Sequence, residues 1–366
     1  MTKVIQMRYR LLEATTALAT ALAIGCGGAD PPPPGNAPML SRAATTTALI
    51  EHDIAPNDTD SAIQGLWLTK HYVSIDPAVN HRGKLFVHLP GTNNPPSSFK
   101  LVAREATRLG YHVIVLMYPN TLAITVCGND PACEESLRLE IIDGIDRTSL
   151  IPVTRAHSIY NRLTKLLQHL DENFPNEGWS KFLKHGEPKW SKIVISGFSF
   201  GGSEATMLAK LHRVHRVTLF AAPRDADAAG LPPAWVALGA TPANRYYGLV
   251  HKQDPLSALT LASWKAPLGM LQFGEAVFED ASMSSPPYGG THMLVTERLP
   301  STGLIANAHG SVSVDQLTPR ALDGTPALGD AWRYMLGERY ADEELANDQD
   351  DQDETSVEHG AAGTRR

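Results

Sequence analysis

The sequence predicts an α/β fold in which one doubly wound, mostly parallel sheet is flanked by helices in a single domain with disordered ends. Strand-like and helix-like segments alternate over residues 70–340, which is the pattern of successive βαβ units. Residues 111–118 (YHVIVLMY) form a nearly continuous apolar run, as strands buried on both faces require. Residues 192–210 pass from a β-branched run through a glycine-rich turn to good helix formers.

The first 25 residues predict an export signal. Three basic residues precede a mostly apolar stretch, residues 14–25, which is too short to span a bilayer. It leads into AIGC at residues 23–26, which resembles the lipobox of bacterial lipoproteins. That resemblance implies cleavage before Cys26 and lipidation of its thiol. We therefore expect a protein lipid-anchored to the periplasmic or surface side of the cell envelope, with simple secretion as the alternative.

The composition of the two ends of the chain differs from that of the domain between them. Residues 26–60 are rich in Pro, Ala and Thr, so we expect a tether before a folded domain at residues 61–340. Residues 341–366 are acidic and nearly free of large apolar side chains, which predicts a disordered tail. The nine acidic and two basic residues of this tail carry as much net charge as the whole chain, −7. The rest is nearly neutral and has no basic stripe, which argues against a nucleic-acid partner.

Apolar periodicity and capping signals predict the elements of the domain in order. Residues 269–278 and 291–297 both have strand character, and we favour the second as the last strand of the sheet. Strands are expected at residues 71–75, 85–89, 111–118, 193–195, 214–221, 245–250 and 291–297, and helices at 97–108, 134–145, 154–173, 202–210 and 329–337.

The turn between the central strand and its helix carries G-x-S-x-G at residues 197–201. A serine on such a sharp turn has a strained backbone, and side chains two residues to either side would collide. Gly197 and Gly201 remove those side chains and leave the Ser199 hydroxyl exposed. The N–H groups at the helix start, including that of Phe200, point to where an oxyanion would form. Ser199 is therefore the predicted nucleophile, and a turn that only packs a helix on the sheet is the alternative.

At this point the chain resembles the α/β-hydrolase superfamily over roughly residues 65–340. The resemblance rests on LPGT at residues 89–92, GFSFGG at residues 197–202, an Asp after the strand beyond, and a late His before a C-terminal helix. This fold uses the chain order Ser, acid, His. The chain looks most like secreted bacterial hydrolases of lipoprotein type that have no large cap domain.

The resemblance implies that a histidine activates the serine. Fourteen histidines compete for that role, and three of them, His251, His292 and His309, lie in the appropriate part of the chain. His309 follows the last expected strand and precedes the final helix, where the superfamily places its base. His292 is the alternative base, and packing in a loop is the other role open to it.

An acid should orient that histidine. Asp254 lies at the end of an expected strand, midway between Ser199 and His309, and is the predicted acid. Asp225, after the preceding strand, is the alternative location. Asp315 is more simply explained as a helix cap or a surface charge.

The resemblance also implies a second oxyanion donor in the loop after an early strand. LPGT stands where the superfamily has H-G-x, so the N–H of Thr92 is the matching donor and that of Phe200 is the first. Pro90 replaces the family's histidine in this loop.

Two cysteines remain besides Cys26. Cys127 and Cys133 flank a short Gly-Asn-Asp-Pro-Ala segment, and in an exported protein this spacing predicts a local disulfide. A metal site needs more ligands than these, and neither C-x-x-C nor H-E-x-x-H occurs, so no metal is expected.

These observations predict a serine hydrolase of carboxylic esters, esterase- or lipase-like, that works through an acyl-enzyme without a cofactor. Small-molecule or lipid esters are the expected substrates, and the membrane is the expected partner of a lipid anchor on Cys26. The alternatives are an acyltransferase or peptidase with the same triad, or a non-catalytic, hydrolase-like binding lipoprotein.

Overall fold

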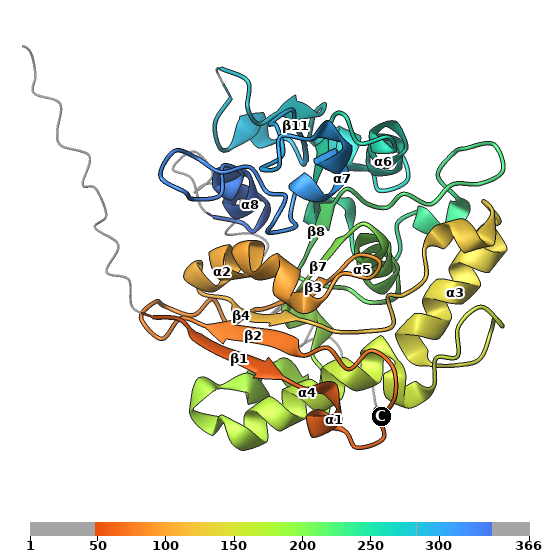
Figure 1. Cartoon of the computed structure of the whole chain (residues 1–366), viewed down its shortest axis with the longest axis vertical. Coiled ribbons are helices and arrows are strands. Elements are labelled where there is room, and N and C mark those ends of the chain that lie inside the picture. Colours follow the sequence, from red (N-terminus) through yellow and green to blue (C-terminus); the bar gives the residue numbers. More distant parts are fainter. Residues whose placement is uncertain (1–47, 283, 339–366) are drawn as a thin grey trace, which may run out of the picture. The chain divides into compact units, whose positions relative to one another are not determined.

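A mostly parallel sheet forms the centre of the chain (Figure 1). The structure is a computed structural model that describes residues 48–282 and 284–338. The strands of the sheet are β1 (Ile50–Ile54), β2 (His71–Ile75), β3 (Leu85–Leu89), β4 (His112–Val115), β7 (Ile193–Phe198), β8 (Arg216–Phe220), β9 (Tyr246–His251), β10 (Val277–Phe278) and β11 (Met293–Thr296), while β5 (Leu183–Lys184) and β6 (Glu187–Pro188) pair separately.

The strand order among the described residues is β1-β2-β4-β3-β7-β8-β9-β11-β10. β2 pairs antiparallel with both β1 and β4, and every other pairing in the sheet is parallel. The predicted α/β class with a mostly parallel sheet is confirmed. Because the central strands are parallel, their carboxyl ends meet at one edge, which is where such sheets place their ligands.

Helices cover both faces of this sheet. α2 packs on β2 and β4 and contacts α8, which lies against β9. α5 packs along β7 and β8 and contacts α3, which in turn contacts α4, and α4 lies on the opposite side of the sheet from α2 (Figure 1). The helices are α1 (Pro56–Thr59), α2 (Lys100–Arg108), α3 (Pro131–Asp143), α4 (Ile159–Asn173), α5 (Phe200–Leu211), α6 (Ser257–Lys265), α7 (Ala308–Ser311) and α8 (Gly329–Met335).

Local chemistry explains where the main helices start. The Ser158 side chain accepts a hydrogen bond from the backbone N–H of Asn161 and so caps α4. The start of α2 is capped from a distance, because the Asp315 carboxylate accepts the backbone N–H groups of Lys100 and Leu101, each at 3.0 Å. This is one of the two roles expected for Asp315.

The structure differs from the sequence expectations at the start of the domain. The tether was expected to reach residue 60, but Ile50–Ile54 forms β1 and pairs along its whole length with β2. The Glu51 carboxylate on this strand accepts hydrogen bonds from Tyr72 and Arg104. Five residues of alternating character between Pro-rich and Asp-rich segments are too short to give a clear period-2 signal, so these tertiary contacts decide the conformation.

Differences elsewhere are smaller. β4 covers only residues 112–115 of the expected 111–118, because the chain leaves the sheet after Val115. Both uncertain segments contain a strand: β11 lies inside the sheet next to β9, and β10 lies at its edge. The helix α6 was not predicted; its residues show no amphipathic stripe.

The expected signal peptide, the lipidation site Cys26, most of the tether and the acidic tail lie outside the described residues. Within residues 48–282 and 284–338, no helix combines the length and apolar character that crossing a membrane requires.

Candidate active site

Ser199 occupies a strained turn between β7 and α5. Its backbone has φ 52° and ψ −120°, a conformation that a residue with a Cβ rarely adopts. A Cβ at Gly197 would collide with the backbone of Gly201, and one at Gly201 would collide with the carbonyl of Leu89. Only glycine at these two positions lets α5 approach the strand ends closely enough to present the Ser199 hydroxyl.

The structure brings Ser199, His309 and Asp254 together from three distant segments. The Ser199 Oγ lies 2.9 Å from Nε2 of His309, and Nδ1 of His309 lies 2.6 Å from Oδ2 of Asp254. His309 sits in the short helix α7, and Asp254 follows β9. With an ionised Asp254 at Nδ1, the proton of a neutral imidazole lies on Nδ1 and Nε2 is left to accept the serine proton.

Asp254 is suited to remain ionised beside this imidazole. It is 2% exposed, and burial by itself raises the pKa of a carboxyl. The hydrogen bond from His309 and the positive charges of His309 and Arg224 oppose burial, and the pKa of Asp254 ends below its usual value.

The alternative residues have other partners. The His292 ring stacks between Tyr247 and Phe273 at centroid distances of 3.9 Å, and burial lowers its pKa to about 3. Asp225 is bound by Arg138. Among the described residues, neither His292 nor Asp225 hydrogen-bonds Ser199 or His309.

The two expected oxyanion donors line the same cavity as Ser199. Within the described chain, the backbone N–H groups of Thr92 and Phe200 have no hydrogen-bond acceptor. The Thr92 loop is fixed from behind, because the side-chain amide of Asn120 donates to the carbonyls of Gly91 and Asn94 at 2.8 and 3.0 Å. Both N–H groups are therefore available to a ligand.

The cavity has a volume of about 320 Å³, enough for a small organic molecule. Its wall includes the segment after β4, the middle of α3 and the loop after β8. The described residues contain no group of three or more His, Cys, Asp or Glu placed to hold a metal ion. The lining residues are Thr92, Asn94, Ala123, Thr125, Arg138, Phe198, Ser199, Phe200, Ser203, Arg224, Asp225, Leu256 and His309.

A second, buried polar cluster borders this cavity and was missed by sequence reasoning. The fully buried Arg138 donates to Glu204 at 2.9 Å and to Asp225 through Nε and Nη2. Ser203 donates its hydroxyl proton to Asp225 at 2.5 Å. Burial raises the pKa of Glu204 to about 8 against the opposing charge of Arg138, and burial together with the charge of Asp225 raises that of Glu134 to about 7.

Arg224 was also missed. Its Nη1 lies 2.7 Å from Nε2 of His309, and its Nη2 lies 4.0 Å from Asp254. The only sequence signal is position, since Arg224 comes just after β8 and so lies at the edge where parallel strands end.

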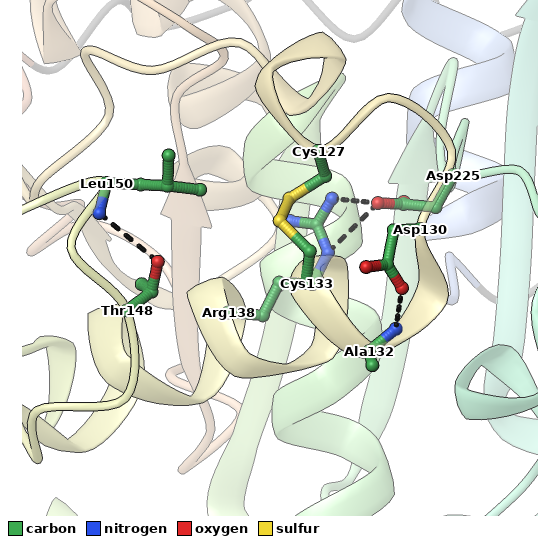
Figure 2. Close-up of a disulfide and its surroundings, with 8 residues drawn as sticks. All are labelled: Cys127, Asp130, Ala132, Cys133, Arg138, Thr148, Leu150 and Asp225. Atoms are coloured by element: carbon green, nitrogen blue, oxygen red, sulfur yellow. Dashed lines mark hydrogen bonds and ion pairs between the residues drawn. A yellow bond between two sulfur atoms is a disulfide. The ribbon is translucent and has the colours of Figure 1, made fainter.

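Cys127 and Cys133 form the expected disulfide, which Figure 2 draws together with the Arg138–Asp225 pair. The bond joins the turn before α3 to the first residues of that helix. Ala123 and Thr125, just before the bond, line the cavity, as does Arg138, one turn beyond it. The disulfide therefore braces one wall of the cavity.

No protein-family model matches the sequence, and no match was found among curated proteins. Among solved structures, the chain is similar to a protein assigned as a dienelactone hydrolase from Klebsiella pneumoniae, with 12% identity over 69% of this chain and 86% of that one and a TM-score of 0.35. It is also similar to an S-formylglutathione hydrolase from Agrobacterium tumefaciens, with 15% identity over 59% of this chain and 79% of that one and a TM-score of 0.32. These similarities to hydrolases are distant.

Proposed function

We propose that the protein is a serine hydrolase of carboxylic esters, with Ser199, His309 and Asp254 as its catalytic residues. The observation that carries this proposal is the continuous series Ser199 Oγ, His309 Nε2 and Nδ1, and Asp254 Oδ2. It begins at a strained serine that faces a cavity with two unused N–H donors. This combination is what nucleophilic catalysis by serine requires.

In the first half of the reaction, Ser199 Oγ bonds to the ester carbonyl carbon while its proton moves to His309 Nε2. The carbonyl π electrons become an oxyanion, which the N–H groups of Thr92 and Phe200 stabilise. When the oxyanion collapses, the bond to the alcohol oxygen breaks and the proton on His309 moves to the leaving alkoxide. The products are an alcohol and an acyl-Ser199 ester.

In the second half, water attacks the acyl carbon and gives one proton to His309. Collapse of the new tetrahedral intermediate breaks the bond to Ser199 Oγ, which takes the proton back. The acid leaves and the site returns to its starting state. Asp254 holds His309 in the correct tautomer and stabilises the imidazolium in both halves.

Two assays on the full-length protein test the proposal: labelling by a fluorophosphonate probe and hydrolysis of p-nitrophenyl esters of graded chain length. The probe should label Ser199 in the wild type and nothing in Ser199→Ala. His309→Ala should lose nearly all labelling, because the hydroxyl is no longer activated.

His292→Ala is the matched control, since His292 packs away from Ser199 and its loss should leave labelling in place. If labelling survives in His309→Ala but disappears in His292→Ala, the base is His292 and not His309. A folded wild type that is not labelled would contradict the proposal and favour the binding-protein alternative.

We further propose that the protein is exported and carries lipid on Cys26. Besides the sequence pattern, the Cys127–Cys133 disulfide supports export, because such bonds persist in oxidising compartments. Mass spectrometry of the mature N-terminus tests this directly, and an unmodified terminus at any other residue would overturn it.

A further inference from the structure

Two hydrogen-bond donors lie within reach of the Nε2 atom of His309, which can accept only one hydrogen bond. Ser199 Oγ lies 2.9 Å away and Arg224 Nη1 lies 2.7 Å away. A neutral imidazole with its proton on Nδ1 has a single lone pair at Nε2. The guanidinium therefore competes for the lone pair that must receive the serine proton.

Arg224 is also less closely paired with carboxylates than the other arginine of the cavity is. The other arginine of the cavity, Arg138, is paired with both Asp225 and Glu204. For Arg224, the nearest carboxylate is Asp254, whose Oδ1 is 4.0 Å away and whose Oδ2 is committed to His309. Within the described chain, Nε and Nη2 of Arg224 donate no hydrogen bond, although the side chain is only 23% exposed.

This arrangement opposes the proposed reaction as long as the cavity holds no anion. Proton transfer from Ser199 makes His309 a cation, and a guanidinium at hydrogen-bond distance disfavours that charge. A negatively charged group on the substrate would relieve both effects. It would draw the Arg224 donors away from Nε2, and it would neutralise the guanidinium charge next to the imidazolium.

Resting on the proposed function, we propose that Arg224 is a specificity-determining residue that selects esters carrying a second, free carboxylate. A guanidinium can bind a carboxylate through two parallel hydrogen bonds, and Arg224 lines the cavity that holds Ser199 with two nitrogens that donate no hydrogen bond within the described chain. The carboxylate would act in substrate binding and would also free the base. This couples recognition of the substrate to activation of the nucleophile.

A matched pair of substrates tests the inference: mono(4-nitrophenyl) adipate and its methyl ester, which share one acyl chain with and without the charge. In wild type, kcat/KM for the anionic ester should exceed that for the neutral one by about 10- to 100-fold, the range expected of a charge-assisted hydrogen-bond pair. Arg224→Gln should reduce this ratio to about one or less, and Arg224→Lys, which keeps charge without the planar fork, should give an intermediate ratio.

Arg108→Gln is the matched control, because this exposed arginine at the end of α2 pairs with Glu105 and does not line the cavity; the ratio should stay at its wild-type value. Fluorophosphonate labelling of each variant separates the two proposals. A wild type that is labelled but has a ratio near one overturns the selection of carboxylates and leaves the hydrolase intact. A ratio that survives in labelled Arg224→Gln also overturns it, whereas a folded wild type that is neither labelled nor active on either ester refutes the hydrolase itself.

Discussion

Two aspartates that follow neighbouring strands face two serines at the start of one helix. Asp254 follows β9 and reaches Ser199 through His309, whereas Asp225 follows β8 and accepts a hydrogen bond directly from Ser203. Both aspartates are almost fully buried, and each lies near an arginine. The two clusters therefore hold similar groups at the same edge of the sheet.

The group that contacts each acid distinguishes the two clusters: it is the His309 imidazole for Asp254 and the Arg138 guanidinium for Asp225. An imidazole can take a proton near neutral pH and return it, while the guanidinium of Arg138 stays charged. Asp225 therefore has a permanent counter-ion and no base to orient, and the acceptor of the Ser203 hydroxyl is this paired carboxylate rather than an imidazole. Ser199 alone has a strained backbone and a titratable neighbour. An acid beside a serine at a strand end is therefore not enough to activate the serine; a titratable base must lie between the two.

The largest expected effect separates the two serines. Ser199→Ala should lower kcat for an activated ester by on the order of 10³-fold or more, since the covalent route is lost. Ser203→Ala should change kcat by less than about tenfold, because it removes a hydrogen bond next to the site and no reacting atom. Steady-state kinetics on one p-nitrophenyl ester measure both changes. Equal losses of kcat in the two variants would contradict the different roles given to the two serines.

The two aspartates should separate in the same way, with stability as a second measurement. Asp254→Asn should also lower kcat, but the fold-loss should be roughly ten- to a hundredfold smaller than the loss caused by Ser199→Ala. Asp225→Asn should instead lower the free energy of unfolding by about 3 kcal/mol, because it leaves the buried Arg138 short of a counter-charge. Guanidinium denaturation gives the free energy of unfolding of each variant, and ester kinetics give its kcat. A loss of stability in Asp254→Asn alone would contradict the structural role given to Asp225.

The pH dependence of stability should report the buried cluster. The pKa of Glu204 is raised from 4.5 to about 8, so between these values the folded chain keeps a proton that the unfolded chain releases. Stability should therefore fall as pH rises through this window. Glu204→Gln removes that ionisation and should flatten the decline by an amount on the order of a few kcal/mol at most. Thermal unfolding between pH 5 and 9 tests this. If stability falls with pH equally in wild type and Glu204→Gln, a group other than Glu204 causes the decline.

The disulfide should have the smallest effect. Replacing Cys127 and Cys133 by Ser removes closure of a short loop, so the free energy of unfolding should fall by no more than about 2 kcal/mol. Because the bond braces a wall of the cavity, KM should change more than kcat. Loss of far-UV circular dichroism in this variant would show that the bond holds more than the local wall.

Sequence reasoning selected Ser199, His309 and Asp254, which the structure brings together, because each follows or opens an element with a strong local pattern and parallel strands bring their ends together. It did not find Arg224 or the Arg138–Glu204 pair. These contacts join segments tens of residues apart, and nothing in the local pattern marks an arginine as facing a cavity rather than solvent. β1 was missed for a related reason, since its pairing with β2 outweighs a weak local preference.

The strained backbone of Ser199 has a consequence for the stability of the fold. A residue with a Cβ at this φ and ψ costs about 1–3 kcal/mol relative to an unstrained position, and glycine at the same place would remove most of that cost. Ser199→Gly should therefore raise the free energy of unfolding while it removes the proposed nucleophile. A serine at this position therefore carries a cost in stability that a use of its hydroxyl would offset.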